Sequence, residues 1–126
     1  MIYSGGCHCG AIRFEVETDG KVTCQECNCS ICSKTSYLHL IAPKSKFKLL
    51  QGTNHLTTYT FDSGEAKHLF CKTCGIKSYY IPRSNPGGFS INVRCLDNPP
   101  TDVTIEPFDG KNWEQNAHKL KHMSDE

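Results

Sequence analysis

Eight of the nine cysteines in this 126-residue chain gather in three short clusters. The central cluster is a C-x-C-x-x-C run at residues 27–32, and Cys24 lies three residues before it. A smaller pair lies on each side in sequence: Cys7 with Cys9, and Cys71 with Cys74. Thiolates one or two residues apart can share one ion at bond lengths of about 2.3 Å, because a tight turn aims both sulfurs inward. The spacing therefore predicts metal centres, and zinc is the metal that such thiolate sets favour.

The two outer pairs each supply two ligands, so neither closes a tetrahedron alone. Together they make a four-thiolate site that connects the N-terminus to the middle of the chain. Sites closed by four protein ligands are structural. We therefore expect one structural zinc ion on these four residues: Cys7, Cys9, Cys71 and Cys74.

The central run supplies three local ligands, Cys27, Cys29 and Cys32. Three protein ligands and one open position are typical of a reactive zinc ion. The alternative is that Cys24 completes this site and makes it a second structural centre. Both alternatives predict two zinc ions per chain. The remaining thiol, Cys95, lies on the same side of an alternating segment as apolar residues, so we expect it to be buried and inert.

Composition indicates a single globular domain, with 21% charged and 37% hydrophobic residues. No apolar run is long enough to span a membrane, and no basic region followed by an apolar one opens the chain. The clustered cysteines then predict an intracellular protein, cytoplasmic or nuclear, because metal-binding thiols persist in reducing compartments. The formal net charge of +1 argues against a nucleic-acid partner, which would need a basic face.

Short apolar and β-branched stretches separated by turn residues predict an all-β zinc-binding domain of antiparallel sheets over residues 1–118, with a frayed tail at 119–126. The clearest alternation lies at residues 89–95, where Ser90 and Asn92 occupy the outward positions. Residues 33–36 read as a polar loop, and a short helix is expected near residues 112–119. The other expected strands are residues 12–16, 22–23, 37–42, 47–50, 56–61, 78–81 and 103–105.

Three motifs in this order resemble the glutathione-dependent formaldehyde-activating (GFA) family: residues 6–10, 27–34 and 70–75. Residues 47–52, 81–88 and 95–97 resemble its animal branch, centromere protein V, more closely. The resemblance implies coiled β-sheets similar to those of methionine sulfoxide reductase B. It also implies a structural zinc ion on the outer pairs and a catalytic zinc ion on the central run.

The activity that the resemblance implies is a zinc-dependent carbon–sulfur lyase or synthase acting on thiol adducts of small aldehydes such as S-hydroxymethylglutathione, with glutathione as co-substrate. His39, which follows the central cluster, and a zinc-bound water are the candidate proton carriers. Lys34 and Arg83 are candidates to pair with glutathione carboxylates. The plainer interpretations are a hydrogen-bonded core histidine and two surface charges.

A second hypothesis involves no catalysis. The chain would be a non-catalytic zinc module that binds a protein partner, as the centromere protein V resemblance suggests. The fourth ligand of the central metal separates the two hypotheses. A small ligand there favours the enzyme, whereas Cys24 there favours the interaction module.

Overall fold

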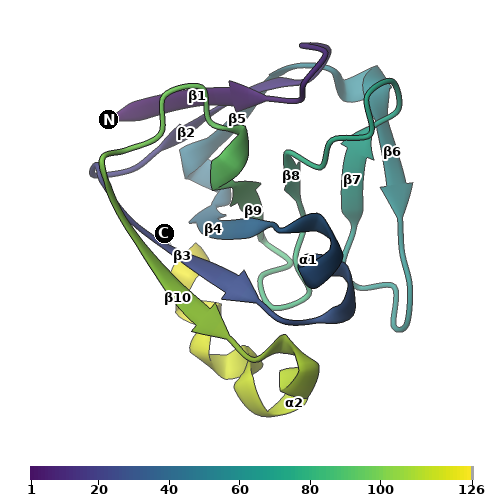
Figure 1. The fold of residues 1–126 in the computed structure, drawn as a ribbon, viewed down its shortest axis with the longest axis vertical. Coiled ribbons are helices and arrows are strands. Elements are labelled where there is room, and N and C mark those ends of the chain that lie inside the picture. The colour runs from purple at the N-terminus through teal and green to yellow at the C-terminus, as the bar shows by residue number, and fades with distance from the viewer. Residues whose placement is uncertain (126) are drawn as a thin grey trace.

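The computed structural model describes residues 1–125, and β-strands dominate it (Figure 1). One sheet has three antiparallel strands in the order β1-β2-β5. These strands are β1 (Ile2–Gly6), β2 (Arg13–Glu17) and β5 (Phe47–Gln51). In β2, Phe14 and Val16 face inward between polar neighbours, which is the period-two pattern of a strand with one buried face.

The central sheet has five strands in the order β10-β3-β4-β9-β8. They are β3 (Lys21–Cys27), β4 (Leu38–Pro43), β8 (Tyr79–Tyr80), β9 (Gly88–Asn92) and β10 (Asp102–Phe108). All neighbours in this sheet are antiparallel except β3 and β10, which run parallel. The expectation of antiparallel sheets therefore holds apart from this one pair. Figure 1 shows β3 and β10 running side by side toward the lower part of the molecule.

A two-stranded ribbon, β6 (Leu56–Tyr59) with β7 (His68–Cys71), lies at one side of the central sheet. Helix α1 (Ser30–Thr35) follows β3, and helix α2 (Trp113–Asn116) follows β10. Short 3-10 turns fill the connections: Lys44–Lys46, Thr53–His55, Val93–Cys95, Gly110–Asn112, Ala117–Lys119 and Lys121–Ser124.

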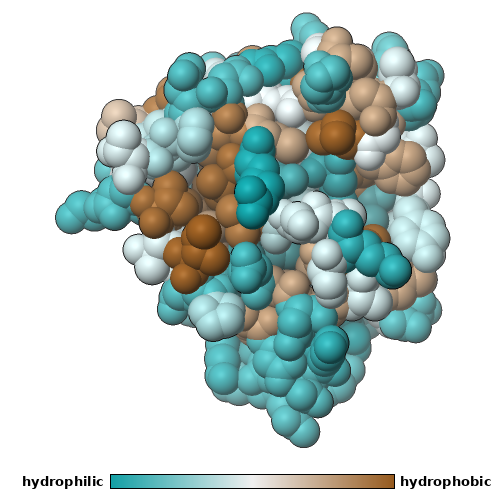
Figure 2. Space-filling view, in the orientation of Figure 1, coloured by the Kyte–Doolittle hydropathy of each residue, from teal (hydrophilic) through white to brown (hydrophobic). Residues whose placement is uncertain are grey.

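The core lies between the first sheet and the central sheet, and Phe14 is at its centre with no exposed surface. The Phe14 ring lies 5.5 Å from the Phe47 ring and 6.3 Å from the Tyr79 ring, centroid to centroid. Aromatic pairs at such separations add stabilisation beyond the area that they bury. Figure 2 shows further apolar side chains on the β3–β10 side, where Ile105 is half exposed, and hydrophilic ones over the C-terminal segment.

The structure differs from the sequence prediction at β9. The strand ends at Asn92 and a 3-10 turn replaces its last three residues, so Cys95 is only half-buried. Ser90 and Asn92, expected to face outward, are buried. β9 is an inner strand, with β4 paired along one edge and β8 along the other. Its consecutive residues Ser90, Ile91 and Asn92 are all buried, so both of its faces are covered as well. Buried polar side chains are tolerated there because they are hydrogen-bonded: the Ser90 hydroxyl pairs with His39 Nδ1, and the Asn92 side-chain amide donates to the Lys77 carbonyl.

Two other predictions were wrong in detail. The polar loop expected at residues 33–36 is helical through Thr35, with Ser36 in the left-handed region at φ 53°. The tail expected to fray at residues 119–126 packs onto the domain over residues 120–124, and residue 126 lies outside the described residues. Leu120 is buried against Ile41 and Phe108, and Asn85 donates hydrogen bonds from its side-chain amide to the Leu120 and Lys121 carbonyls. Within residues 1–125, no helix is long and apolar enough to cross a membrane.

We predict that Phe14→Ala lowers the free energy of unfolding by about 3–5 kcal/mol, because the rings around it cannot close the cavity. Leu50→Ala is the matched control. Leu50 is 48% exposed, so its truncation should change stability by less than about 0.5 kcal/mol. Urea unfolding of both variants measures the difference. Equal losses in the two variants would contradict the placement of the core.

Candidate metal centres and active-site cavity

The four outer cysteines converge in the structure, as their spacing predicted. Their sulfurs all lie within 4.8 Å of one another. Cys9 Sγ lies 3.6 Å from Cys7 Sγ and 3.6 Å from Cys71 Sγ. A tetrahedron with metal–sulfur bonds of about 2.3 Å has edges of about 3.8 Å, so the observed spacing fits one tetrahedral ion.

Backbone turns shape this four-cysteine cluster. Gly10 follows the first pair with φ 85°, and Gly75 follows the second with φ 76°. Residues other than glycine disfavour this left-handed region of the backbone. The turns also aim amide protons at sulfur. The backbone N–H of Cys74 hydrogen-bonds to Cys71 Sγ at 3.5 Å, and this contact lowers the pKa of the Cys71 thiol. The turns therefore favour the thiolate form that a metal needs.

The central cluster forms where β3 passes into α1. Cys27 ends the strand, Cys29 is the N-cap residue of the helix, and Cys32 lies in the first helical turn. The three sulfurs lie within 4.8 Å of one another. Hydrogen bonds from the neighbouring thiols of Cys27 and Cys32 lower the pKa of Cys29 to about 2. The hydrogen bonds of Cys32 with Cys27 and Cys29 raise the pKa of the Cys32 thiol far above its usual range.

These opposed pKa shifts have one physical cause. Three thiols so close together cannot all ionise, because each new thiolate is repelled by the first. A divalent cation removes the repulsion and is the partner that this donor set lacks. The chemistry of the three sulfurs therefore fits a bound metal ion.

Cys24 does not join this cluster. It lies in the middle of β3, and its side chain points into the hydrophobic core with Val22 and has no exposed surface. Side chains alternate along a strand, so Cys24 and Cys27, three residues apart, point to opposite faces. Among residues 1–125 the central metal group consists of Cys27, Cys29 and Cys32 alone. This arrangement leaves a tetrahedral ion with one position free for another ligand.

Gly110 presses against the central cluster from the other end of the chain. A Cβ atom at this position would overlap Cys27 Sγ and would lie 3.1 Å from Cys29 Cβ. Asn28 holds the segment around Gly110 against the cluster through two hydrogen bonds. Its side-chain nitrogen donates to the Asp109 carboxylate, and its side-chain oxygen accepts from the Lys111 backbone N–H. Gly110 thus closes one side of the metal centre.

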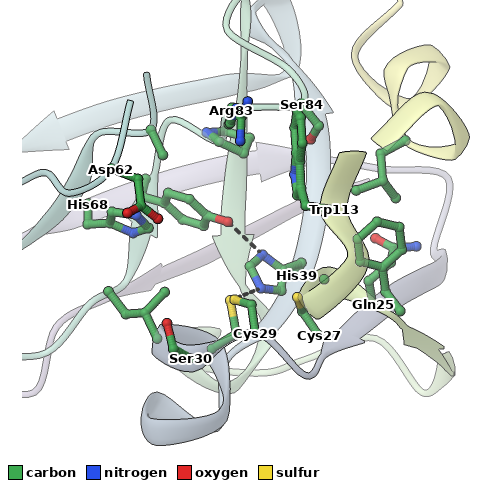
Figure 3. A pocket seen from close by; sticks show the side chains of 18 of the residues that line it. Gln25, Cys27, Cys29, Ser30, His39, Asp62, His68, Arg83, Ser84 and Trp113 are labelled. Carbon is green, nitrogen blue, oxygen red and sulfur yellow. Dashed lines mark hydrogen bonds between the residues drawn. The ribbon is translucent and has the colours of Figure 1, made fainter. Parts of the chain in front are cut away.

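The three central sulfurs face a cavity of about 380 Å³. Figure 3 shows Cys27, Cys29 and His39 close together, with Arg83 and Trp113 beyond them, His68 at one end and Gln25 at the other. The wall is built from β3, β4, β7 and β8, from helices α1 and α2, and from the loops that follow β6, β8 and β10. The volume is within the range of a small-ligand site.

His39 lies beside the central cluster, but both of its ring nitrogens are engaged. Nε2 lies 3.1 Å from Cys32 Sγ, and Nδ1 lies 2.9 Å from Ser90 Oγ and 3.2 Å from the Tyr80 hydroxyl. Burial, with the nearby charge of Lys77, lowers the pKa of His39 to about 3. His39 is therefore a buried, neutral ring with a partner on each of its nitrogens.

The two residues expected to pair with glutathione carboxylates, Arg83 and Lys34, lie in different places relative to the cavity. Arg83 lines the cavity, where its guanidinium stacks 3.8 Å above the Trp113 ring and pairs with the Glu114 and Glu65 carboxylates at 2.8 and 3.4 Å. Lys34 is exposed on α1 and does not line the cavity. The helix decides this, because two residues correspond to a rotation of about 200°, so Cys32 points inward and Lys34 outward.

Sequence reasoning missed several cavity residues, including His68, Gln25 and Trp113. It also missed the buried Lys77, whose ammonium lies 2.7 Å from His68 Nδ1. Only the position of His68, three residues before Cys71, could have drawn attention to it. The others come from elements far apart in the chain, and no local pattern marks them.

We predict two zinc ions per wild-type chain and loss of folding in Cys74→Ser, because a structural metal contributes its binding energy to folding. Elemental analysis and thermal melting measure these outcomes. Cys95→Ser is the control, since Cys95 belongs to neither cluster, and it should keep both ions. A Cys74→Ser protein that is soluble and melts cooperatively would contradict the structural assignment.

Gly110→Ala should reduce the metal content from two ions to one while the protein stays folded, because the new methyl group displaces Cys27 Sγ from the centre. Gly87→Ala is the matched control, since its Cβ would meet nothing within 4 Å. Metal content and circular dichroism of both variants decide the matter. Full metal content in Gly110→Ala would show that Gly110 does not abut the site.

Comparison with known proteins agrees with this geometry. The model of the family described as "Glutathione-dependent formaldehyde-activating enzyme" matches residues 2–115. A Halomonas elongata protein, provisionally named as such an enzyme, is 29% identical over 82 residues. That match covers 59% of this chain and 52% of the relative, so the chain spans about half the length of this curated relative.

A crystal structure of a Rhodobacter sphaeroides protein has the same fold, with a TM-score of 0.70 and 37% sequence identity. The match covers 82% of this chain and 99% of that protein. The family match extends across both cysteine clusters and nearly the whole domain. This chain belongs to the glutathione-dependent formaldehyde-activating (GFA) family.

Proposed function

We propose that this protein is a zinc-dependent carbon–sulfur lyase and synthase that acts on thiol adducts of small aldehydes, with S-hydroxymethylglutathione as the model substrate. The observation that carries the proposal is a cluster of three cysteines, with no fourth ligand among residues 1–125, whose sulfurs face a cavity of about 380 Å³. Family membership supports it, since the family's description names glutathione and formaldehyde.

The reaction joins a thiol to an aldehyde. In the synthetic direction a carbon–sulfur bond forms, the carbonyl π electrons move to oxygen, and the oxygen gains the proton that the thiol lost. In the reverse direction the carbon–sulfur bond breaks and sulfur keeps the electron pair. A zinc ion on Cys27, Cys29 and Cys32 would supply Lewis acidity, which lowers the pKa of a thiol at the free position.

The chain's own residues prepare the cavity for this chemistry. His39 orients Cys32: with Nδ1 accepting from the Tyr80 and Ser90 hydroxyls, Nε2 carries the proton and donates it toward Cys32 Sγ. Such hydrogen bonds to a ligating sulfur hold the side chain in place and moderate its charge. His39 is therefore a positioning residue in this proposal.

Arg83 is the candidate for a glutathione carboxylate. Its Nη2 donates to Glu114 and its Nε faces Glu65, whereas its Nη1 has no partner within residues 1–125. The Trp113 ring below keeps the guanidinium plane fixed. A preorganised donor of this kind suits an anionic ligand.

The non-catalytic alternative, a protein-interaction module like centromere protein V, is less well supported. It would be favoured by a closed central site with Cys24 as the fourth ligand, but Cys24 lies in the core. Arg83 and Trp113 also face a cavity lined by the central cysteines, and a purely structural zinc site would need no such cavity.

Cobalt in place of zinc tests the open position, because its visible spectrum responds to a change of ligand. Glutathione should shift the wild-type spectrum saturably and release a proton. Cys24→Ser should keep this response and Cys29→Ser should lose it while the outer cluster still holds metal. A wild-type spectrum that ignores glutathione but responds in Cys24→Ser would favour the interaction module.

The same titration tests the carboxylate site. Arg83→Gln should weaken glutathione binding by about tenfold or more, the usual size of one charge-assisted contact. Lys34→Gln is the matched control, since Lys34 lies outside the cavity. Equal effects of the two substitutions would remove Arg83 from the proposal.

A further inference from the structure

His68, the first residue of β7, is held in one orientation on the cavity wall. Its ring lies between two aromatic rings that are nearly parallel to it. The Tyr80 ring is 5.0 Å away at 14°, and the Phe61 ring is 5.2 Å away at 19°. His68 is 5% exposed, so the stack leaves its ring little freedom to turn.

Lys77 decides which nitrogen of His68 carries the proton. The Lys77 ammonium lies 2.7 Å from His68 Nδ1 and 3.8 Å from the centre of the Tyr80 ring, a cation–π geometry that suits a charged group. An ammonium group donates hydrogen bonds and cannot accept them. His68 Nδ1 is therefore the acceptor, and the ring proton is on Nε2.

The Nε2 atom of His68 is open to the cavity. It has no hydrogen-bond partner within residues 1–125. Within residues 1–125, the fully buried side-chain nitrogen and oxygen atoms that lack a hydrogen-bond partner are Gln25 Oε1 and Arg83 Nε. His68 Nε2 is not one of them, so this unpartnered atom keeps some exposed surface. A buried ring with one accessible polar atom, on the wall of a cavity, presents that atom to whatever the cavity binds.

We propose that His68 Nε2–H is a catalytic hydrogen-bond donor to the oxygen atom of the thiol–aldehyde adduct, and that Lys77 is the positioning residue that fixes this donor. The inference rests on the proposed function and adds to it the group that recognises the aldehyde oxygen. His39 cannot take this role, because both of its nitrogens are occupied.

The donor acts where charge develops. When the carbon–sulfur bond forms, the carbonyl π pair moves to oxygen, and the Nε2–H bond stabilises that growing negative charge. The oxygen then takes from solvent the proton that the thiol released. Cleavage reverses each movement, and His68 ends each cycle unchanged. Burial and the Lys77 charge lower the pKa of His68 to about 4, so the ring stays neutral and is available as a donor at neutral pH.

The test compares two substitutions that place an amide N–H at different positions. Glutamine carries its amide nitrogen where His68 has Nε2, and asparagine carries it where His68 has Nδ1. Exchange between formaldehyde with glutathione and S-hydroxymethylglutathione is followed by NMR for wild type, His68→Gln and His68→Asn. His118→Asn is the surface control, since His118 is exposed and does not line the cavity.

His68→Asn should slow the exchange by about 10²–10³-fold, the usual cost of one lost donor to a developing oxyanion, and His68→Gln should restore most of the rate. Glutathione binding to the cobalt protein without aldehyde should be the same in all four proteins, since a free thiol has no aldehyde oxygen. A purely structural His68 would instead make Asn and Gln equally harmful and would weaken both readouts together.

Nitrogen-15 NMR of the imidazole provides a readout independent of activity. Wild-type protein should show His68 with the proton on Nε2, and Lys77→Met should show a mixture of tautomers together with a slower exchange. A proton on Nδ1 in wild type, or a folded His68→Asn protein with the wild-type rate, would overturn the assignment of His68. Wild-type protein that does not accelerate the exchange at all would overturn the proposed function and this inference with it.

Discussion

The structure depends first on the convergence of four thiols from two turns. Cys9 and Cys71 are 62 residues apart in sequence, yet their sulfurs lie 3.6 Å apart. Four sulfurs this close could hold one metal ion, and a shared cation would offset the entropy cost of closing the long loop between the two turns. The cluster thereby joins the turn between β1 and β2 to the end of β7.

That connection reaches the cavity. Strand β7 ends at Cys71 in the structural cluster and begins at His68 on the cavity wall. A four-residue strand has little room to shift once one end is held. A metal ion in the four-cysteine cluster would therefore also fix the position of the cavity wall, although the cluster lies outside the cavity lining.

The central cluster imposes a second constraint, the balance of buried charge. Three thiolates with a divalent ion leave one net negative charge. Lys77 is buried, has no carboxylate partner within residues 1–125, and lies over the Tyr80 ring. Burial lowers the pKa of Lys77 to about 8, and the charges of the central thiols oppose this decrease. The ammonium and the thiolate cluster thus stabilise one another across the aromatic side chains.

The sequence by itself determined the features that local spacing controls. Alternation at residues 12–16 predicted β2, and the apolar run at residues 37–42 predicted β4. The thiol spacing predicted both metal groups, because a turn or strand sets the direction of neighbouring side chains. Only the tertiary structure decided that Cys24 faces the core and that Ser90 is buried. It also decided that Gly110 contacts the central cluster and that Arg83 and His68 line the cavity. These positions follow from contacts between residues up to about 80 apart, such as Asn28 with Asp109, and such contacts leave no periodic pattern in the chain.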